Sequence, residues 1–78
     1  MLTKAEAAQQ VRAAKVRLGL SWAQIAEAVN RPVAWVTSAL LGQHPMAEAE
    51  ARAAAELLEL DERVVEALRL QPSRGALE

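Results

Sequence analysis

The sequence predicts an all-α fold, and three features of the chain support this expectation. Apolar residues recur at the three- and four-residue spacing of amphipathic helices. Two hydroxyl residues each precede a Glu or Gln by three positions, which is the spacing of a helix-capping box. Gly, Pro and Asn residues divide the 78 residues into short segments, a length that suits one small domain. We therefore expect five helices that form one domain over residues 1–71.

The first helix is expected over residues 4–18. Thr3 and Glu6 have capping-box spacing, alanines with Val11 give a weakly amphipathic pattern, and Gly19 can close the helix. Because no aromatic residue or second basic element joins its basic residues, we interpret them as a solvated face and not as phosphate contacts. These basic residues are Lys4, Arg12, Lys15 and Arg17.

The second helix is expected over residues 22–29, and it starts at another capping box, formed by Ser21 and Gln24. Its apolar residues recur at i, i+3, i+4 and i+7, as in a helix that buries one stripe. The members of this stripe are Trp22, Ile25, Ala26 and Val29. The segment from Asn30 to Pro32 then interrupts the helix, because proline lacks an N–H and fixes its own φ.

The third helix is expected over residues 33–41, after Pro32 and before Gly42, which favours the left-handed conformation that closes a helix. Two short helices joined by a tight turn, with the small Ala26 at their crossing, form a helix-turn-helix pattern. The sequence thus predicts a five-helix bundle of the lambda-repressor-like type. In such folds the second helix of the motif usually lies in the DNA major groove.

The third helix lacks the side chains that read bases. Val36, Ala39 and Leu40 are expected to face inward, with Trp35 at the margin. Base readout relies on bidentate Arg, Asn or Gln, and phosphate binding relies on Lys and Arg. We therefore expect the helix-turn-helix to be present as a fold and not to read DNA. The residues expected outward are Val33, Ala34, Thr37, Ser38 and Leu41.

The fourth and fifth helices are expected over residues 47–58 and 62–70. Glu48 and Arg52 form a favourable i, i+4 pair on the fourth helix, and Asp61 is a suitable cap for the fifth. The expected inward stripe of the fourth helix is Ala47, Ala51, Ala54, Ala55 and Leu58, and that of the fifth is Val64, Val65 and Leu68. The expected core includes Ile25, Val29, Val36, Leu40, Leu58 and Leu68.

Composition argues against several classes of site. The chain has no cysteine and one histidine, which disfavours a zinc site, and no Gly-rich phosphate loop or carboxylate cluster is present. We predict no catalytic, cofactor-binding or metal-binding residue, and no cofactor. His44, in the turn Gln43–Pro45, is expected to be solvated and without a carboxylate partner. Trp22 and Trp35 favour core packing or a protein interface over base stacking.

Charge and hydropathy disfavour nucleic acid and membranes as partners. The net charge is −1, with basic residues scattered along the chain, and no apolar run has the length of a signal peptide or a membrane span. A cytoplasmic protein is therefore expected. A domain this small exposes much surface relative to its core, so we also expect it to associate with itself.

Four segments in order resemble the amino-terminal domain of cyanase, also called cyanate hydratase or cyanate lyase. These segments are LSWAQIAEA from Leu20, VTSALLGQ from Val36 to Gln43, ELDE from Glu59 to Glu62, and Pro-x-Arg-Gly from Pro72 to Gly75. The resemblance implies a lyase that converts cyanate and bicarbonate to ammonia and carbon dioxide, assembled as a homodecamer. It also implies that residues 72–78 lead to an absent carboxy-terminal domain, which holds the catalytic residues in that family.

Three functional hypotheses remain open at this point. The first is an assembly domain of a cyanate hydratase, inactive alone because no catalytic residue can be carried over to this chain. The second is a small DNA-binding transcriptional regulator that uses the helix-turn-helix. The third is a stand-alone interaction module. The uncharged outer face of the third helix favours the first hypothesis over the second.

Overall fold

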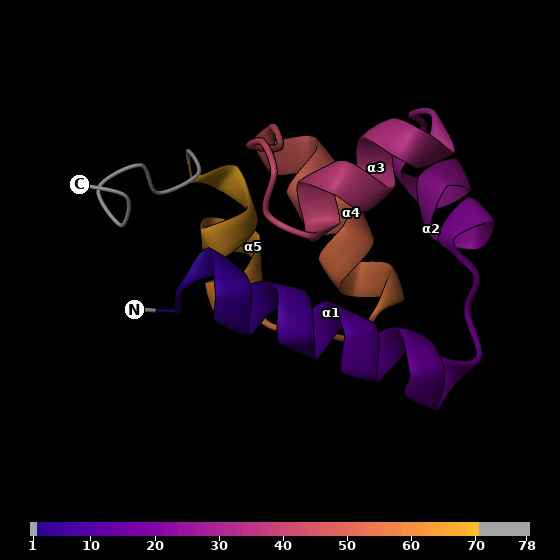
Figure 1. Ribbon diagram of the computed structural model, residues 1–78, viewed down its shortest axis with the longest axis horizontal. Helices are drawn as coiled ribbons and strands as arrows, with labels where there is room; N and C mark the ends of the chain where they lie inside the picture. Colours follow the sequence, from indigo (N-terminus) through magenta and orange to yellow (C-terminus); the bar gives the residue numbers. More distant parts are fainter. Residues whose placement is uncertain (1, 71–78) are drawn as a thin grey trace.

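The computed structural model describes residues 2–70 and confirms the all-α prediction (Figure 1). Its helices are α1 (Lys4–Leu18), α2 (Trp22–Val29), α3 (Val33–Leu40), α4 (Glu48–Leu57) and α5 (Glu62–Arg69), and residues 2–70 contain no β-strand. Each helix lies within one residue of its predicted bounds at both ends. The predicted boundary after residue 71 and the predicted tail over 72–78 lie outside the described residues.

Helix α1 runs along the length of the domain and is capped as predicted (Figure 1). The backbone N–H of Glu6 donates to the Thr3 hydroxyl at 3.0 Å, and the Thr3 N–H donates to the Glu6 carboxylate at 2.8 Å. Gly19 closes the helix with φ 67°, a left-handed conformation that costs little without a Cβ. Val11 and three alanines of this helix are buried. The helix therefore offers a narrow apolar stripe to the rest of the bundle.

Helices α2 and α3 pack against each other as the predicted helix-turn-helix. Ser21 and Gln24 form the expected capping box at the start of α2. Asn30 ends α2 with φ 64°, a left-handed conformation that asparagine tolerates better than most residues. Pro32 then precedes α3 at its N-cap position, and no side chain caps that helix. Gly42 follows the end of α3 with φ 92°.

Helices α4 and α5 complete the bundle, and one prediction about α4 is wrong. Ala47 was expected on the inward stripe, but it is exposed, because it is the N-cap residue and lies outside the helical register. Asp61 caps α5 as predicted, accepting from the backbone N–H of Arg63 at 3.1 Å. The rest of both predicted stripes is buried: Ala51, Ala54, Ala55 and Leu58, with Val64, Val65 and Leu68.

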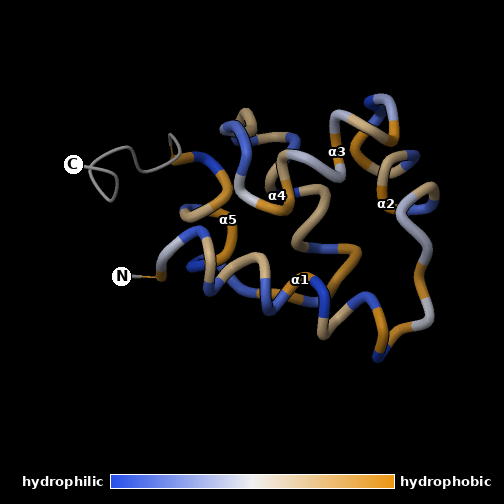
Figure 2. Tube along the Cα trace, in the orientation of Figure 1, coloured by the Kyte–Doolittle hydropathy of each residue, from blue (hydrophilic) through white to orange (hydrophobic). Residues whose placement is uncertain are grey.

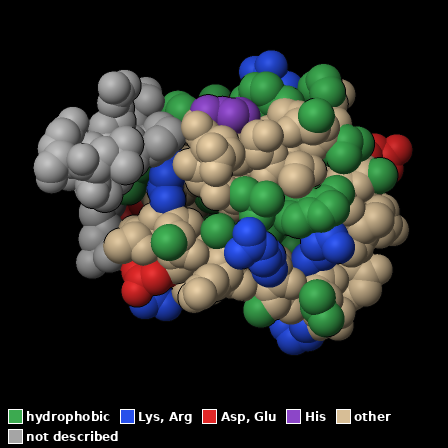
Figure 3. Space-filling view, viewed as in Figure 1, with side chains coloured by type: hydrophobic (Ala, Val, Ile, Leu, Met, Phe, Trp, Pro, Cys, Tyr) green, Lys and Arg blue, Asp and Glu red, His purple; other side chains and the backbone are tan. Residues whose placement is uncertain are grey.

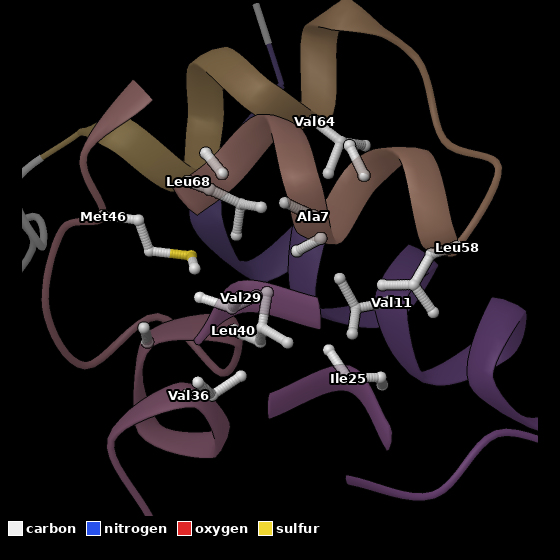
Figure 4. Close-up of a cluster of buried hydrophobic side chains, with 14 of the residues drawn as sticks. Ala7, Val11, Ile25, Val29, Val36, Leu40, Met46, Leu58, Val64 and Leu68 are labelled. Carbon is white, nitrogen blue, oxygen red and sulfur yellow. The ribbon is translucent and has the colours of Figure 1, made fainter. Parts of the chain in front are cut away.

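All six predicted core residues are buried, and side chains from every helix converge on one cluster (Figure 4). Met46 joins this core from the loop before α4, and its N–H donates to the carbonyl of Leu68 at 2.9 Å. Along α1 hydrophobic and strongly hydrophilic residues alternate, as expected for a helix half covered by its neighbours (Figure 2). Within residues 2–70, no helix is both long and apolar enough to cross a membrane.

Candidate functional site

The outward face of α3 is the first candidate site, because this helix takes the place of a DNA-reading helix. Val36, Ala39 and Leu40 are buried and Trp35 is half-buried, as predicted. The predicted outer face is confirmed in part: Val33 is 44% exposed and Ala34 is exposed, whereas Thr37 and Ser38 are half-buried. Leu41 was expected outward but is half-buried, because the chain bends there toward Gly42.

Helix α3 has the sequence VAWVTSAL, so it carries no charged side chain and no Asn or Gln. Every other helix in the described part of the chain carries at least one charged residue. In Figure 3 the surface over α3 is green and tan, and the blue and red atoms lie around it. The face therefore has no bidentate donor for a base edge and no cation for a phosphate.

A second group of side chains surrounds Trp35, and the sequence did not predict it. The guanidinium carbon of Arg31 lies 4.4 Å from the centre of the Trp35 ring, and the His44 ring centre lies 4.7 Å from that ring. Nε of Arg31 donates to Oε2 of Glu50 at 2.6 Å. The prediction that His44 is solvated is wrong: it is half-buried against Trp35. The cluster thus connects the α2–α3 turn, α3, the α3–α4 loop and α4.

The contacts of Glu50 in this cluster stabilise the fold. The hydrogen bond from Arg31 is the largest cause that lowers the pKa of Glu50 below its ordinary value of 4.5. A carboxylate held ionised in this way is a poor proton acceptor near neutral pH. Oε1 of Glu50 also accepts from the N–H of Ala47 at 3.0 Å, which satisfies a free donor at the start of α4. Both oxygens of Glu50 are therefore used to hold the fold.

The basic residues of α1 are mostly engaged within the domain. Nζ of Lys15 lies 5.1 Å from the centre of the Trp22 ring, so the prediction that no aromatic residue joins these basic side chains is wrong. Nζ of Lys4 lies 3.4 Å from the Leu68 carbonyl oxygen, to which it donates, and burial lowers the pKa of Lys4. Nη1 of Arg17 lies 3.7 Å from Oε1 of Glu59. The expected solvated face is therefore found in part: Arg12 and Arg17 are exposed, whereas Lys4 and Lys15 are half-buried and in contact with other residues of the domain.

Surface ion pairs link α4 to α5. The predicted pair is present, with Nη2 of Arg52 3.1 Å from Oε2 of Glu48. The sequence pattern did not predict a second partner, Glu62, whose Oε1 lies 2.8 Å from Nη1 of Arg52. Arg52 lowers the pKa of Glu62, mainly through this hydrogen bond. Local spacing reveals i, i+4 pairs only, so a pair across two helices has no sequence signal. Residues 2–70 contain no group of three or more His, Cys, Asp or Glu side chains that could hold a metal ion.

Comparison with known proteins gives the same family as the sequence motifs. A family model described as the amino-terminal domain of cyanate hydratase matches residues 4–72. A cyanate hydratase of Mycolicibacterium vanbaalenii is 46% identical over 97% of this chain and 50% of its own length. That of Mycobacterium avium is 41% identical over 97% of this chain and 49% of its length.

A cyanate hydratase of Pseudomonas savastanoi pv. phaseolicola is 46% identical over 90% of this chain and 45% of its own length. The chain thus spans about half the length of the curated relatives it matches. The match covers all five helices, including the uncharged α3 and the cluster around Trp35. On these grounds the chain belongs to the cyanate hydratase family, and it corresponds to the amino-terminal domain of that family.

Proposed function

We propose that this chain is the assembly domain of a cyanate hydratase, and that it contributes subunit contacts and no catalytic residue. The observation that carries the proposal is the match of residues 4–72 to the amino-terminal domain of that family. The described surface agrees with it: one face is uncharged and partly apolar, and the polar clusters are engaged in internal contacts.

The complete enzyme is proposed to decompose cyanate with bicarbonate to ammonia and carbon dioxide in the cytoplasm, as a homodecamer. Bicarbonate acts in this scheme as a second substrate, and no other cofactor is needed. We propose that the catalytic residues lie in the half of the complete enzyme that this chain does not span; the chain covers 50% of the M. vanbaalenii relative. The 78-residue chain alone is therefore expected to release no ammonia from cyanate and bicarbonate.

A fusion protein tests the proposal. The first half of the M. vanbaalenii cyanate hydratase is replaced by residues 1–71 of this chain, and ammonia release from cyanate and bicarbonate is measured. Activity close to that of the intact relative is expected, because the two domains belong to one family and are 46% identical. The control carries an unrelated helical domain of similar size in the same place. A fusion that folds but is as inactive as this control would refute the proposal.

The helix-turn-helix geometry keeps DNA binding as the second candidate function. The net charge of −1 and the absence of base-reading side chains on α3 argue against it. We expect no specific complex in a titration with genomic DNA fragments at physiological salt. Specific DNA-binding proteins reach dissociation constants of about 10⁻⁸ M or lower, so nanomolar binding to a defined site would favour the regulator instead.

A further inference from the structure

We propose that the ε-amine of Lys4 is a modification site, at which cyanate, the substrate of the proposed enzyme, carbamoylates this domain. Lys4 reacts in preference to Lys15, which is the other lysine of the chain. The inference rests on the proposed function only for the source of the cyanate. The reaction itself needs no more than the folded chain and cyanate, so it can be tested whether or not the fusion protein is active.

Carbamoylation is the addition of a neutral amine to isocyanic acid, the conjugate acid of cyanate. The lone pair of Nζ forms a bond to the carbon atom, and the electron pair of one C=N π bond moves to the isocyanate nitrogen. That nitrogen takes the proton that Nζ loses, so the product is an uncharged urea. No group leaves, and nothing is oxidised or reduced. Because only the neutral amine carries the lone pair, desolvation of a lysine activates it as a nucleophile.

Lys4 lies in a part of the fold where three segments meet. It is the first residue of α1, and the start of this helix lies beside α5 (Figure 1). Its Nζ donates to the carbonyl oxygen of Leu68 at 3.4 Å, which is long for such a bond. The loop after α3 approaches from the other side, because a Cβ on Gly42 would lie 3.6 Å from the Lys4 Cβ. The side chain is therefore half-buried.

The ammonium charge of Lys4 is poorly compensated by its surroundings. No carboxylate oxygen of residues 2–70 lies within 4.0 Å of its Nζ. The Glu6 carboxylate accepts a backbone N–H in the capping box of α1, and Nη1 of Arg69 lies 3.8 Å from Oε1 of Glu48. A neutral carbonyl replaces only part of the hydration that burial removes, so burial lowers the pKa of Lys4.

Lys15 provides a matched comparison on the same helix. It is half-buried like Lys4, but its Nζ lies 5.1 Å from the centre of the Trp22 ring, within the range of a cation–π contact. Only the ammonium form makes this contact, so carbamoylation at Lys15 has to give it up. Carbamoylation at Lys4 gives up one long hydrogen bond to a neutral acceptor. Lys4 is therefore the lysine that reacts more readily.

Carbamoylation of Lys4 should weaken the packing of α1 on α5. The Leu68 carbonyl accepts from both Lys4 and the N–H of Met46, the latter at 2.9 Å, so this oxygen joins α1, α5 and the loop before α4. Loss of the positive charge removes a favourable interaction with the carbonyl end of α5. The added carbamoyl group must also be accommodated at a half-buried position. Cyanate in excess of what the enzyme removes would thus destabilise the enzyme itself.

Mass spectrometry of the 78-residue chain treated with potassium cyanate tests the site. Cleavage after arginine gives the peptides 1–12 and 13–17, which separate Lys4 from Lys15, and fragmentation of the first peptide separates Lys4 from the amino-terminal amine. In the folded chain Lys4 should be carbamoylated several-fold faster than Lys15. In guanidinium chloride, which removes both environments, the two rates should be equal. Equal rates in the folded chain, or the same preference after unfolding, would overturn the proposal.

Lys4→Arg and Lys15→Arg test the effect on stability, because arginine keeps the charge and the donors but stays protonated and so does not react. After the same cyanate treatment, the melting temperature of the wild-type chain and of Lys15→Arg should fall, whereas that of Lys4→Arg should stay close to its untreated value. The amino-terminal amine reacts in all three chains, so it does not affect the comparison.

Circular dichroism of the untreated variants checks the fold, and if Lys4→Arg does not fold, the two lysine rates in the wild-type chain still decide the outcome. These measurements do not involve cyanate decomposition, so either proposal can fail while the other stands. An equal fall in the melting temperature of Lys4→Arg and Lys15→Arg would refute the destabilising role of the modification at Lys4.

Discussion

The contacts around Trp35 determine how the loops of this domain are held. Arg31 lies against the ring and also donates to Glu50, so one side chain joins the α2–α3 turn to the first turn of α4. His44 packs against the same ring from the α3–α4 loop. These residues are far apart along the chain and belong to no periodic stripe. Sequence patterns predicted that Trp35 lies at the margin of the core, but not which side chains surround it.

Replacing Glu50 by Gln should lower stability in a pH-dependent way. The pKa of Glu50 is lowered from 4.5 in the folded domain, mainly by the hydrogen bond from Arg31, so its ionised form stabilises the fold above that pH. That stabilisation disappears as the pH falls from 4.5 through the lowered pKa. At neutral pH the free energy of unfolding of the wild-type domain should exceed that of Glu50→Gln by about 1 kcal/mol or less, because Arg31 is partly exposed. In strong acid the two free energies should be equal.

Urea unfolding at several pH values measures this difference. Glu56→Gln on the same helix is the control, and it should cause no loss at neutral pH, because a negative charge near the end of α4 gains nothing from the helix dipole. If Glu50→Gln lowered the free energy of unfolding equally well below pH 4.5, the stabilising role given to ionised Glu50 would be contradicted.

At the scale of the helices, most of the fold could be predicted from the sequence. Capping boxes at Thr3 and Ser21, the left-handed residue Gly19 and the cap Asp61 are local devices, and each acts where it was expected. Errors arose where local rules compete with tertiary position. Ala47 continues the alanine stripe of α4 in spacing but lies before the helix begins, and Leu41 lies after α3 ends.

Ser21→Ala should weaken α2 specifically. The Ser21 hydroxyl accepts from the N–H of Gln24 at 3.1 Å, and losing such a cap costs about 1 kcal/mol. A change of that size lowers the melting temperature of a domain this small by about 4–8 °C. Thermal unfolding followed by circular dichroism measures the shift. Ser38→Ala, within α3, is the control and should change the melting temperature by much less. Equal shifts for the two variants would contradict the capping role.

At the scale of the whole molecule, the domain combines a helix-turn-helix arrangement with a third helix, α3, that carries no charged side chain and no Asn or Gln. Within residues 2–70, buried side chains from every helix form one core. Because this core fixes the position of α3, the outer face of that helix is already formed in the single domain. The sequence predicted that α3 lacks base-reading side chains. The sequence pattern could not establish how far each outward residue is exposed: only Val33 and Ala34 are exposed, whereas Thr37 and Ser38 are half-buried.

The central claim is that this domain drives subunit assembly, and the molar mass of the fusion protein tests it most directly. Light scattering should give the fusion the same oligomer mass as the intact M. vanbaalenii relative. The same fusion carrying Val33→Lys and Ala34→Lys should give a smaller oligomer, whereas Val16→Lys should leave the mass unchanged, with circular dichroism showing that all variants are folded. A full-sized oligomer from the folded double variant would contradict the claim.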